Sequence, residues 1–250
     1  LRQFGDLDIL VDEKDAFKAG NILVENGFTA PYPLTILKNK TCLRVDSDFA
    51  LAGNTNNILI EMHWRLFRKN IGHHLTFDQF SKDPKTISIN GNAIQTLSPE
   101  LHLLYLSLHG SKHAWERIEW IVDIDKFIRN NTLDEQLLKE TFKMLKADRP
   151  ILVGLLLAHR LFQTPLQTWI IKKINKDESI NVRFVPYPNA PFLKILKSST
   201  ISVSELELKN LVTNIQTFGI IKEPEKNEIF ENLEYMINKI QKNNIKVALF

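Results

Sequence analysis

The sequence predicts an α+β fold, in which a small mixed β-sheet lobe with flanking helices precedes a helical lobe. The first 70 residues alternate short apolar segments with one helical segment, whereas residues 98–163 have nearly continuous helical patterning. The chain has 250 residues, of which 44% are hydrophobic and 24% charged, as in ordinary globular proteins with a substantial core. We place the boundary near residue 95, so the expected domains are residues 1–95 and 96–250.

The elements of the first lobe follow from local patterns. Branched apolar residues favour strands in several short segments, namely residues 6–11, 34–37 (LTIL), 41–45, 57–66 (NILIEMHWRL) and 86–89 (TISI). Residues 12–26 have the apolar spacing of a helix, and Gly27 follows as a cap at its carboxyl end. The NGN sequence after residue 89 predicts a turn.

The second lobe begins at a clear helix start. Ser98 suits the N-cap, Pro99 suits the first helical position, and Glu100 places an acid in the first turn. Helical patterning continues to about Gln163, with breaks near residues 130–131 and 148–150. Three prolines predict a loop over residues 181–191, and an amphipathic pattern predicts a last helix over residues 227–243.

Bulk properties narrow the class of protein. The formal net charge of +3 is too small by itself to indicate nucleic-acid binding. The single Cys42 cannot form an internal disulfide, which favours a reducing compartment and a cytoplasmic location. The longest apolar run, residues 151–158, is far shorter than a membrane span, so we expect no membrane partner. Because the first residue is leucine, we expect an N-terminal portion of the first lobe to be missing.

Two aspartates interrupt the first predicted strand. Asp6 and Asp8 are two residues apart, so their carboxylates project from the same face of the strand. Neighbouring carboxylates repel each other unless a cation lies between them, and Mg²⁺ prefers such hard oxygen ligands. The alternative is a solvated pair of aspartates at the end of a strand.

A second predicted strand also carries an acid among apolar residues. Glu61 and His63 share one face of the segment ILIEMHW. If this strand neighbours the first one, three carboxylates converge and could hold two Mg²⁺ ions about 4 Å apart, as in phosphoryl and nucleotidyl transfer. The alternative for Glu61 is a salt bridge to Arg65 or Arg44.

The helical lobe contains cationic and aromatic residues in the segment HGSKHAWERIEW. Lys112 and Arg117 could each contact a phosphate. Trp115 and Trp120 could stack on a base or fill the core. These alternatives stay open at this point.

The same segment has two histidines at a spacing that some zinc sites use. His109 and His113 lie one helical turn apart, on the face that also carries Lys112. Gly110 follows the first histidine where the H-E-x-x-H motif has glutamate, and the sequence offers no obvious third ligand. The alternative is a pair of hydrogen-bonded structural histidines.

Taken in order, three motifs resemble a bacterial family of largely uncharacterised nucleotidyltransferases in the polymerase-β-like nucleotidyltransferase superfamily. The motifs are RQFGDLDILV, IEMHW and TLSPELHLLYLSLHGSKHAWERIEWIVDID. They match the family pattern of an arginine before Gly-Asp-x-Asp, an acid two residues before His-Trp, and a helix with His-x-x-x-His-x-Trp. The resemblance covers roughly residues 2–125.

This resemblance implies a reaction and a set of site residues. Asp6 and Asp8 would bind two Mg²⁺ ions, and Glu61 would bind the ion nearer the acceptor. An acceptor hydroxyl would attack the α-phosphorus of a nucleoside triphosphate such as ATP and release pyrophosphate. The acceptor would be a small molecule, a protein or an RNA. The residues expected to bind the nucleotide are Arg2, Gly5, His109, Lys112 and Arg117.

Two departures from the family pattern keep other functions open. The Gly-Gly or Gly-Ser turn that usually precedes the paired aspartates either lies in the missing N-terminal portion or is absent, and the third acid is glutamate rather than aspartate. A catalytically degenerate nucleotide-binding or interaction protein on the same fold is one alternative. A metal-dependent phosphohydrolase that uses His109 and His113 is another. The late lysines leave an RNA acceptor open, although helical spacing also fits a solvated face: Lys239, Lys242 and Lys246.

Overall fold

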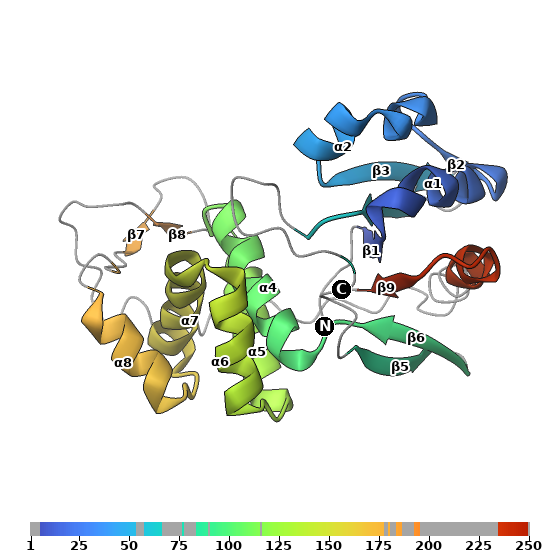
Figure 1. Cartoon of the computed structure of the whole chain (residues 1–250). Helices are drawn as coiled ribbons and strands as arrows, with labels where there is room; N and C mark the ends of the chain where they lie inside the picture. The colour runs from blue at the N-terminus through green and yellow to red at the C-terminus, as the bar shows by residue number, and fades with distance from the viewer. Residues whose placement is uncertain are drawn as a thin grey trace, which may run out of the picture. The chain divides into compact units, whose positions relative to one another are not determined.

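A computed structural model describes residues 6–53, 58–66, 77, 84–89, 91–115, 117–177, 180, 184–186, 193–195 and 235–249 (Figure 1). These residues form two compact units that divide between Ser98 and Pro99. The sheet unit contains the described residues up to Ser98 together with residues 235–249. The helical unit contains the described residues from Pro99 to 195.

The sheet unit is built on seven strands in the order β2-β3-β4-β1-β9-β6-β5. Their bounds are β1 (Leu7–Val11), β2 (Phe28–Thr29), β3 (Asp48–Gly53), β4 (Leu59–His63), β5 (Lys85–Ile89), β6 (Asn92–Thr96) and β9 (Val247–Leu249). β1 runs parallel to β4, and β9 runs antiparallel to β1 but parallel to β6. This mixed sheet with flanking helices confirms the predicted α+β class.

The helices that flank this sheet come from the beginning and from the end of the chain. Asp12 caps the short turn η1 (Glu13–Asp15), which leads into α1 (Ala16–Glu25). Gly27 follows α1 with a φ of 91°, a left-handed conformation that glycine adopts at low cost. Residues 235–242 are also helical.

One face of the sheet forms the core of this unit. Ile9 and Val11 of β1 and Met62 of β4 share a buried cluster with residues from α1 and from the helix at 235–242, including Leu23 and Ile237. Because side chains alternate along a strand, the residues between these apolar positions project from the opposite face. Asp8, Glu61 and His63 are among those residues.

Two of the predicted strands are wrong. The segment 34–37 lies in a 3₁₀ turn, η2 (Leu34–Lys38), and the segment 41–45 lies in α2 (Lys40–Val45). The Asn39 side chain accepts a hydrogen bond from the Thr41 backbone and caps α2, so local capping outweighs the strand preference of the branched residues. Four strands of this sheet, β2, β3, β6 and β9, have no counterpart among the predicted strands.

The end of the chain differs from the expected domain division. Residues 235–249 fall within the range assigned to the helical lobe, yet they belong to the sheet unit. Met236, Ile237 and Ile240 of the terminal helix are buried in the sheet core, and β9 inserts between β1 and β6. The predicted helix at 227–243 therefore coincides with a helix over residues 235–242, and its first part lies outside the described residues.

The helical unit contains five labelled helices and a short strand pair. The helices are α4 (Pro99–Lys112), α5 (Glu119–Asn130), α6 (Glu135–Leu145), α7 (Asp148–Phe162) and α8 (Thr168–Lys176). β7 (Phe184–Pro186) pairs with β8 (Leu193–Ile195), so a strand lies inside the segment predicted as a loop. The predicted break at 148–150 is displaced, because Pro150 occupies the first turn of α7, where proline is tolerated. No helix among the described residues has the length and apolar character needed to cross a membrane.

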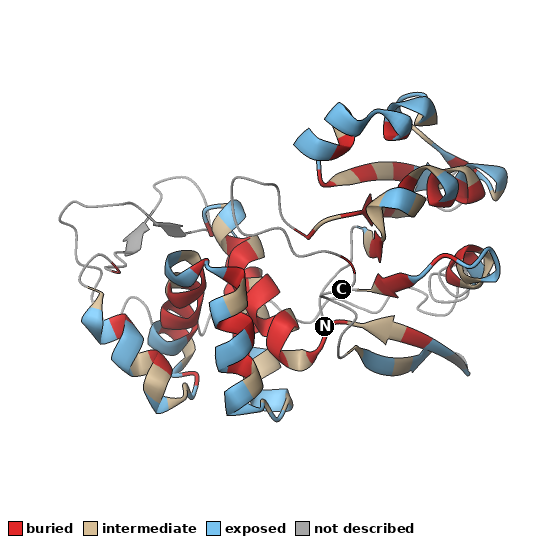
Figure 2. Ribbon diagram, viewed as in Figure 1, coloured by how far each residue is buried: buried red, intermediate tan, exposed pale blue. Residues whose placement is uncertain are grey.

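The apolar helix α7 packs against α4 and α5, and its inward residues are buried (Figure 2). Trp115 lies across this contact. A Cβ atom added at Gly110 of α4 would lie 2.1 Å from the Trp115 ring, and one added at Gly154 of α7 would lie 2.7 Å from it. Both glycines are therefore needed to let the indole fit between the two helices.

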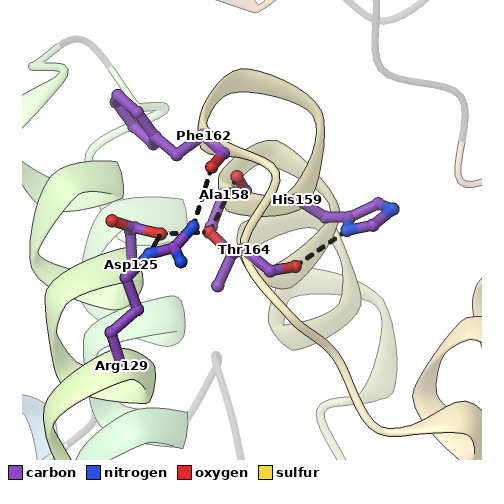
Figure 3. A network of polar contacts seen from close by, with 6 residues as sticks. All are labelled: Asp125, Arg129, Ala158, His159, Phe162 and Thr164. Atoms are coloured by element: carbon purple, nitrogen blue, oxygen red, sulfur yellow. Dashed lines mark hydrogen bonds and ion pairs between the residues drawn. The ribbon is translucent and has the colours of Figure 1, made fainter.

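A buried polar network ties α5 to the end of α7 (Figure 3). The Asp125 carboxylate accepts hydrogen bonds from Arg129 Nε and from the Thr164 hydroxyl, both at 2.7 Å. Arg129 also donates to the Phe162 carbonyl, and His159 Nδ1 donates to the Thr164 carbonyl. These contacts provide hydrogen-bond donors for backbone carbonyl groups at the end of α7, which have no partner within the helix.

Candidate active site

Three potential metal ligands converge on the polar face of the sheet. β1 and β4 are parallel neighbours, and Asp8 stands directly opposite Glu61. His63 is two residues further along β4 and therefore projects from the same face as Glu61. One ligand atom from each of these three side chains lies within 4.8 Å of the other two.

The His63 imidazole is the most buried of the three side chains in this cluster. His63 Nε2 lies 3.1 Å from Asp8 Oδ1 and 3.5 Å from Glu61 Oε2. The His63 side chain is 7% exposed, whereas those of Asp8 and Glu61 are 25% and 34% exposed. The carboxylates therefore face solvent more than the histidine that joins them.

The protonation of His63 follows from these contacts. Burial by itself lowers the pKa of His63, but hydrogen bonds to Asp8 and Glu61 and the charges of Asp8 and Asp48 outweigh it. Together these effects raise the pKa of His63 from 6.5 to about 9. Asp48 contributes because it lies on β3 directly opposite His63. The imidazolium is thus the counter-charge of the carboxylates at neutral pH.

The donor set suits a divalent cation. Two carboxylates provide the hard oxygen ligands that Mg²⁺ and Mn²⁺ prefer, and an imidazole can add a nitrogen ligand. A cation held by Asp8 and Glu61 would balance the negative charge of these carboxylates. Without a bound cation, the proton on His63 balances it instead. The same three side chains can therefore hold a cation, or hold a proton between them.

The predicted acids are placed as follows. Asp8 and Glu61 lie together, as expected if the two strands that carry them are neighbours. Asp6 is exposed, precedes β1 by one residue and lies outside the group of three. Arg65, one of the alternative partners of Glu61, pairs with Glu13 and donates to the Arg44 carbonyl.

His63 is the member of the cluster that sequence reasoning did not place in the site. The signal was present, because the spacing of Glu61 and His63 puts them on one face of a strand. What was missing was the register of β1 against β4, which brings Asp8 to the same point.

The predicted nucleotide-binding residues of the second lobe lie in the helical unit. Lys112 is exposed at the end of α4, and Arg117 is exposed with its guanidinium 3.3 Å from Glu119 and 6.0 Å from the Trp120 ring centroid. The His109 and His113 rings have centroids 4.9 Å apart, and both pack against Trp120. The two histidines belong to an aromatic cluster, and no group of three metal ligands includes them among the described residues. Arg2 and Gly5 lie outside the described residues.

Comparison with known proteins gives one match. A family model described as "Uncharacterised nucleotidyltransferase" matches residues 1–163, which is more than half of the chain. No curated protein and no solved structure matches the chain. The matched range contains both strands that carry the carboxylates, and it contains His109 of α4 and His113 in the turn that follows α4.

Proposed function

The chain belongs to the uncharacterised nucleotidyltransferase family, and we propose that it moves a nucleoside monophosphate from a nucleoside triphosphate to a hydroxyl acceptor. The observation that supports this proposal most strongly is the convergence of Asp8 and Glu61 from two adjacent parallel strands. The ladder between neighbouring strands fixes the backbone positions from which the two carboxylates project, so the two ligands start from a defined separation.

Asp8 and Glu61 are the proposed metal ligands, and Asp6, one residue before β1, would complete the set. Two Mg²⁺ ions bound there would neutralise the triphosphate and lower the pKa of the acceptor hydroxyl. His63 would hold the Asp8 carboxylate in one orientation through its hydrogen bond. Such positioning is worth orders of magnitude in rate when the reacting atoms must be in line.

The proposed reaction exchanges one bond at phosphorus for another and releases one proton. The acceptor oxygen bonds to the α-phosphorus as the hydroxyl gives its proton to solvent water, and the bond from the α-phosphorus to the bridging oxygen breaks. The electron pair of that bond leaves with pyrophosphate. ATP is a proposed donor, and a small molecule, a protein or an RNA is the proposed acceptor.

Lys112 and Arg117 are the proposed phosphate contacts from the helical unit. Both are exposed cationic side chains near the end of α4, in the range that the family model matches. His109, Arg2 and Gly5 complete the proposed nucleotide-binding set by resemblance. The Gly-Asp-x-Asp motif and the acid on the neighbouring strand support our further proposal that the chain belongs to the polymerase-β-like superfamily.

The test is a pyrophosphate-release assay with each of the four nucleoside triphosphates, Mg²⁺ and cell extract as the source of acceptor. We expect Asp8→Asn and Glu61→Gln each to lower release at least about 100-fold, because each removes charge that the transition state needs. Asp46→Asn and Glu25→Gln are matched controls at exposed positions and should change release less than about twofold. Full activity of a folded Asp8→Asn variant would exclude the proposed role of this carboxylate.

A second candidate is a catalytically degenerate nucleotide-binding protein. The position of Asp6 favours it, because this exposed residue lies outside the group formed by Asp8, Glu61 and His63. This candidate predicts that calorimetry detects Mg²⁺-dependent binding of a nucleoside triphosphate, lost in Asp8→Asn, while no pyrophosphate is released with any acceptor source.

A further inference from the structure

The helical unit contains a surface pocket that the proposed reaction does not use. It has a volume of about 660 Å³ and lies between α6, the start of α7 and α8. Its lining residues are Lys139, Phe142, Lys143, Lys146, Asp148, Trp169 and Lys173. The volume falls within the range of pockets that bind small molecules.

Two aromatic side chains form the apolar wall of this pocket. Phe142 is buried, and the half-buried Trp169 packs on it edge to face, with centroids 5.5 Å apart and an angle of 87° between the rings. The Trp169 indole also donates a hydrogen bond to Gln167 Oε1 at 2.6 Å. These contacts fix the plane of the indole, so a flat ligand group would meet a preorganised surface.

Cationic side chains surround that wall. Four lysines and one aspartate line the pocket, an excess of three positive charges. Lys139 pairs with Glu135, and Lys173 pairs with Asp148. Lys143 and Lys146 are exposed and form no ion pair within the described part of the chain. Their charge is therefore available to an anion.

Lys146 has an unusual backbone conformation. It caps the end of α6 with a φ of 46°, in the left-handed region that glycine or asparagine usually occupies at this position. A lysine in that conformation is strained by about 1 kcal/mol. A cationic side chain at the carboxyl end of a helix is generally favoured by the helix dipole. Lys146 lines the pocket from this position.

We propose that this pocket is a nucleotide-binding site, separate from the carboxylate cluster. The base would stack on Trp169, and the phosphate would bind Lys143 and Lys146. Stacking on an aromatic side chain and attraction to clustered lysines are the two interactions that such a ligand combines. A free mononucleotide and one nucleotide of an RNA strand present the same chemistry. This inference does not depend on the proposed transfer reaction.

The test is titration calorimetry of the full chain in EDTA, so that the carboxylate cluster holds no divalent cation. The probes are AMP, adenosine, inorganic phosphate and an oligoadenylate of about ten nucleotides. We expect AMP to bind at least about tenfold more tightly than adenosine or phosphate, because only AMP has both the base and the charge. Tighter binding of the oligoadenylate than of AMP would identify an RNA strand as the source of the nucleotide.

Two variants with the same loss of charge locate the site. Lys143→Gln/Lys146→Gln removes the pocket lysines near the end of α6, and Lys172→Gln/Lys176→Gln removes two exposed lysines of α8 that do not line the pocket. We expect a loss of AMP affinity of about tenfold or more in the first variant and less than about twofold in the second. Trp169→Leu should weaken AMP binding by a similar factor without changing the affinity for phosphate.

Several outcomes would overturn the inference. Equal losses in both lysine variants would show diffuse attraction to surface charge, and absence of binding by AMP and by the oligoadenylate would exclude the site. Asp8→Asn should leave AMP binding in EDTA unchanged. A loss in that variant would assign the binding to the carboxylate cluster and contradict a separate pocket.

Discussion

His63 couples the chemistry of the carboxylate cluster to the stability of the sheet unit. Its raised pKa means that the folded state binds this proton more tightly than the unfolded state does. In the metal-free protein, the stabilisation is fully present below about pH 6.5 and is lost as the pH rises through about 9. A shift of this size corresponds to about 3 kcal/mol.

Urea unfolding in EDTA at pH 6 and at pH 9.5 tests this coupling. We expect the wild-type protein to lose about 3 kcal/mol more between these pH values than His63→Gln does, because the variant cannot lose the proton. The comparison cancels the titration of lysines and tyrosines, which both proteins share. Equal losses in the two proteins would contradict the raised pKa.

Single residues also show where the sequence is informative. The shared face of Glu61 and His63 follows directly from strand periodicity, whereas the predicted partnership of Asp6 with Asp8 stays a prediction because Asp6 precedes β1. The role of Gly110 does not, because the atoms that exclude a Cβ there belong to the Trp115 ring, which a left-handed turn returns to α4. From the sequence alone, the only inference about Gly110 was that it stands where the zinc motif H-E-x-x-H has glutamate.

At the scale of elements, side-chain contacts decide how helices join. Asp125 of α5 contacts Thr164, which follows α7 and is fully buried. The Asp125 carboxylate is also largely buried, at 7% exposure of its side chain. A buried carboxylate with two donors stabilises the junction. Removing it takes the acceptor from Arg129 Nε and leaves the Thr164 hydroxyl with the Ala158 carbonyl alone.

We expect Asp125→Ala to lower the free energy of unfolding by about 2 kcal/mol. Glu140→Ala is the control, because Glu140 is exposed and accepts an exposed hydrogen bond from Gln136, and it should change stability by less than about 0.5 kcal/mol. Chemical unfolding followed by far-ultraviolet circular dichroism measures both. If the two variants have equal stability, the network in Figure 3 is not a significant part of the helical unit's stability.

At the scale of the whole molecule, the end of the chain completes the sheet that its beginning starts. β9 is the strand that joins β1 to the β5–β6 hairpin, since Ala248 pairs with Leu10 on one side and with Gln95 on the other. The helical unit is thus inserted between two segments of the sheet unit. Each unit has its own buried core.

Proline at position 248 tests this arrangement. Ala248→Pro removes the backbone N–H of a central strand, so we expect loss of hydrogen-exchange protection in β1 and β6 but not in α4 or α7. Ala248→Gly keeps the N–H and should retain protection in β1 and β6, with a cost near 1 kcal/mol. Uniform loss of protection across both units in Ala248→Pro would show that the units unfold together.

The sequence by itself determined the α+β class, the helix that begins at Pro99, and the strands that carry Asp8 and Glu61. These features depend on local periodicity and capping, which neighbouring residues define. Only the tertiary structure decided that His63 joins the carboxylates, that residues 41–45 form a helix, and that residues 247–249 pair in the middle of the sheet. Strand order and register are set by contacts between residues far apart in the chain, and the local pattern of one segment does not specify them.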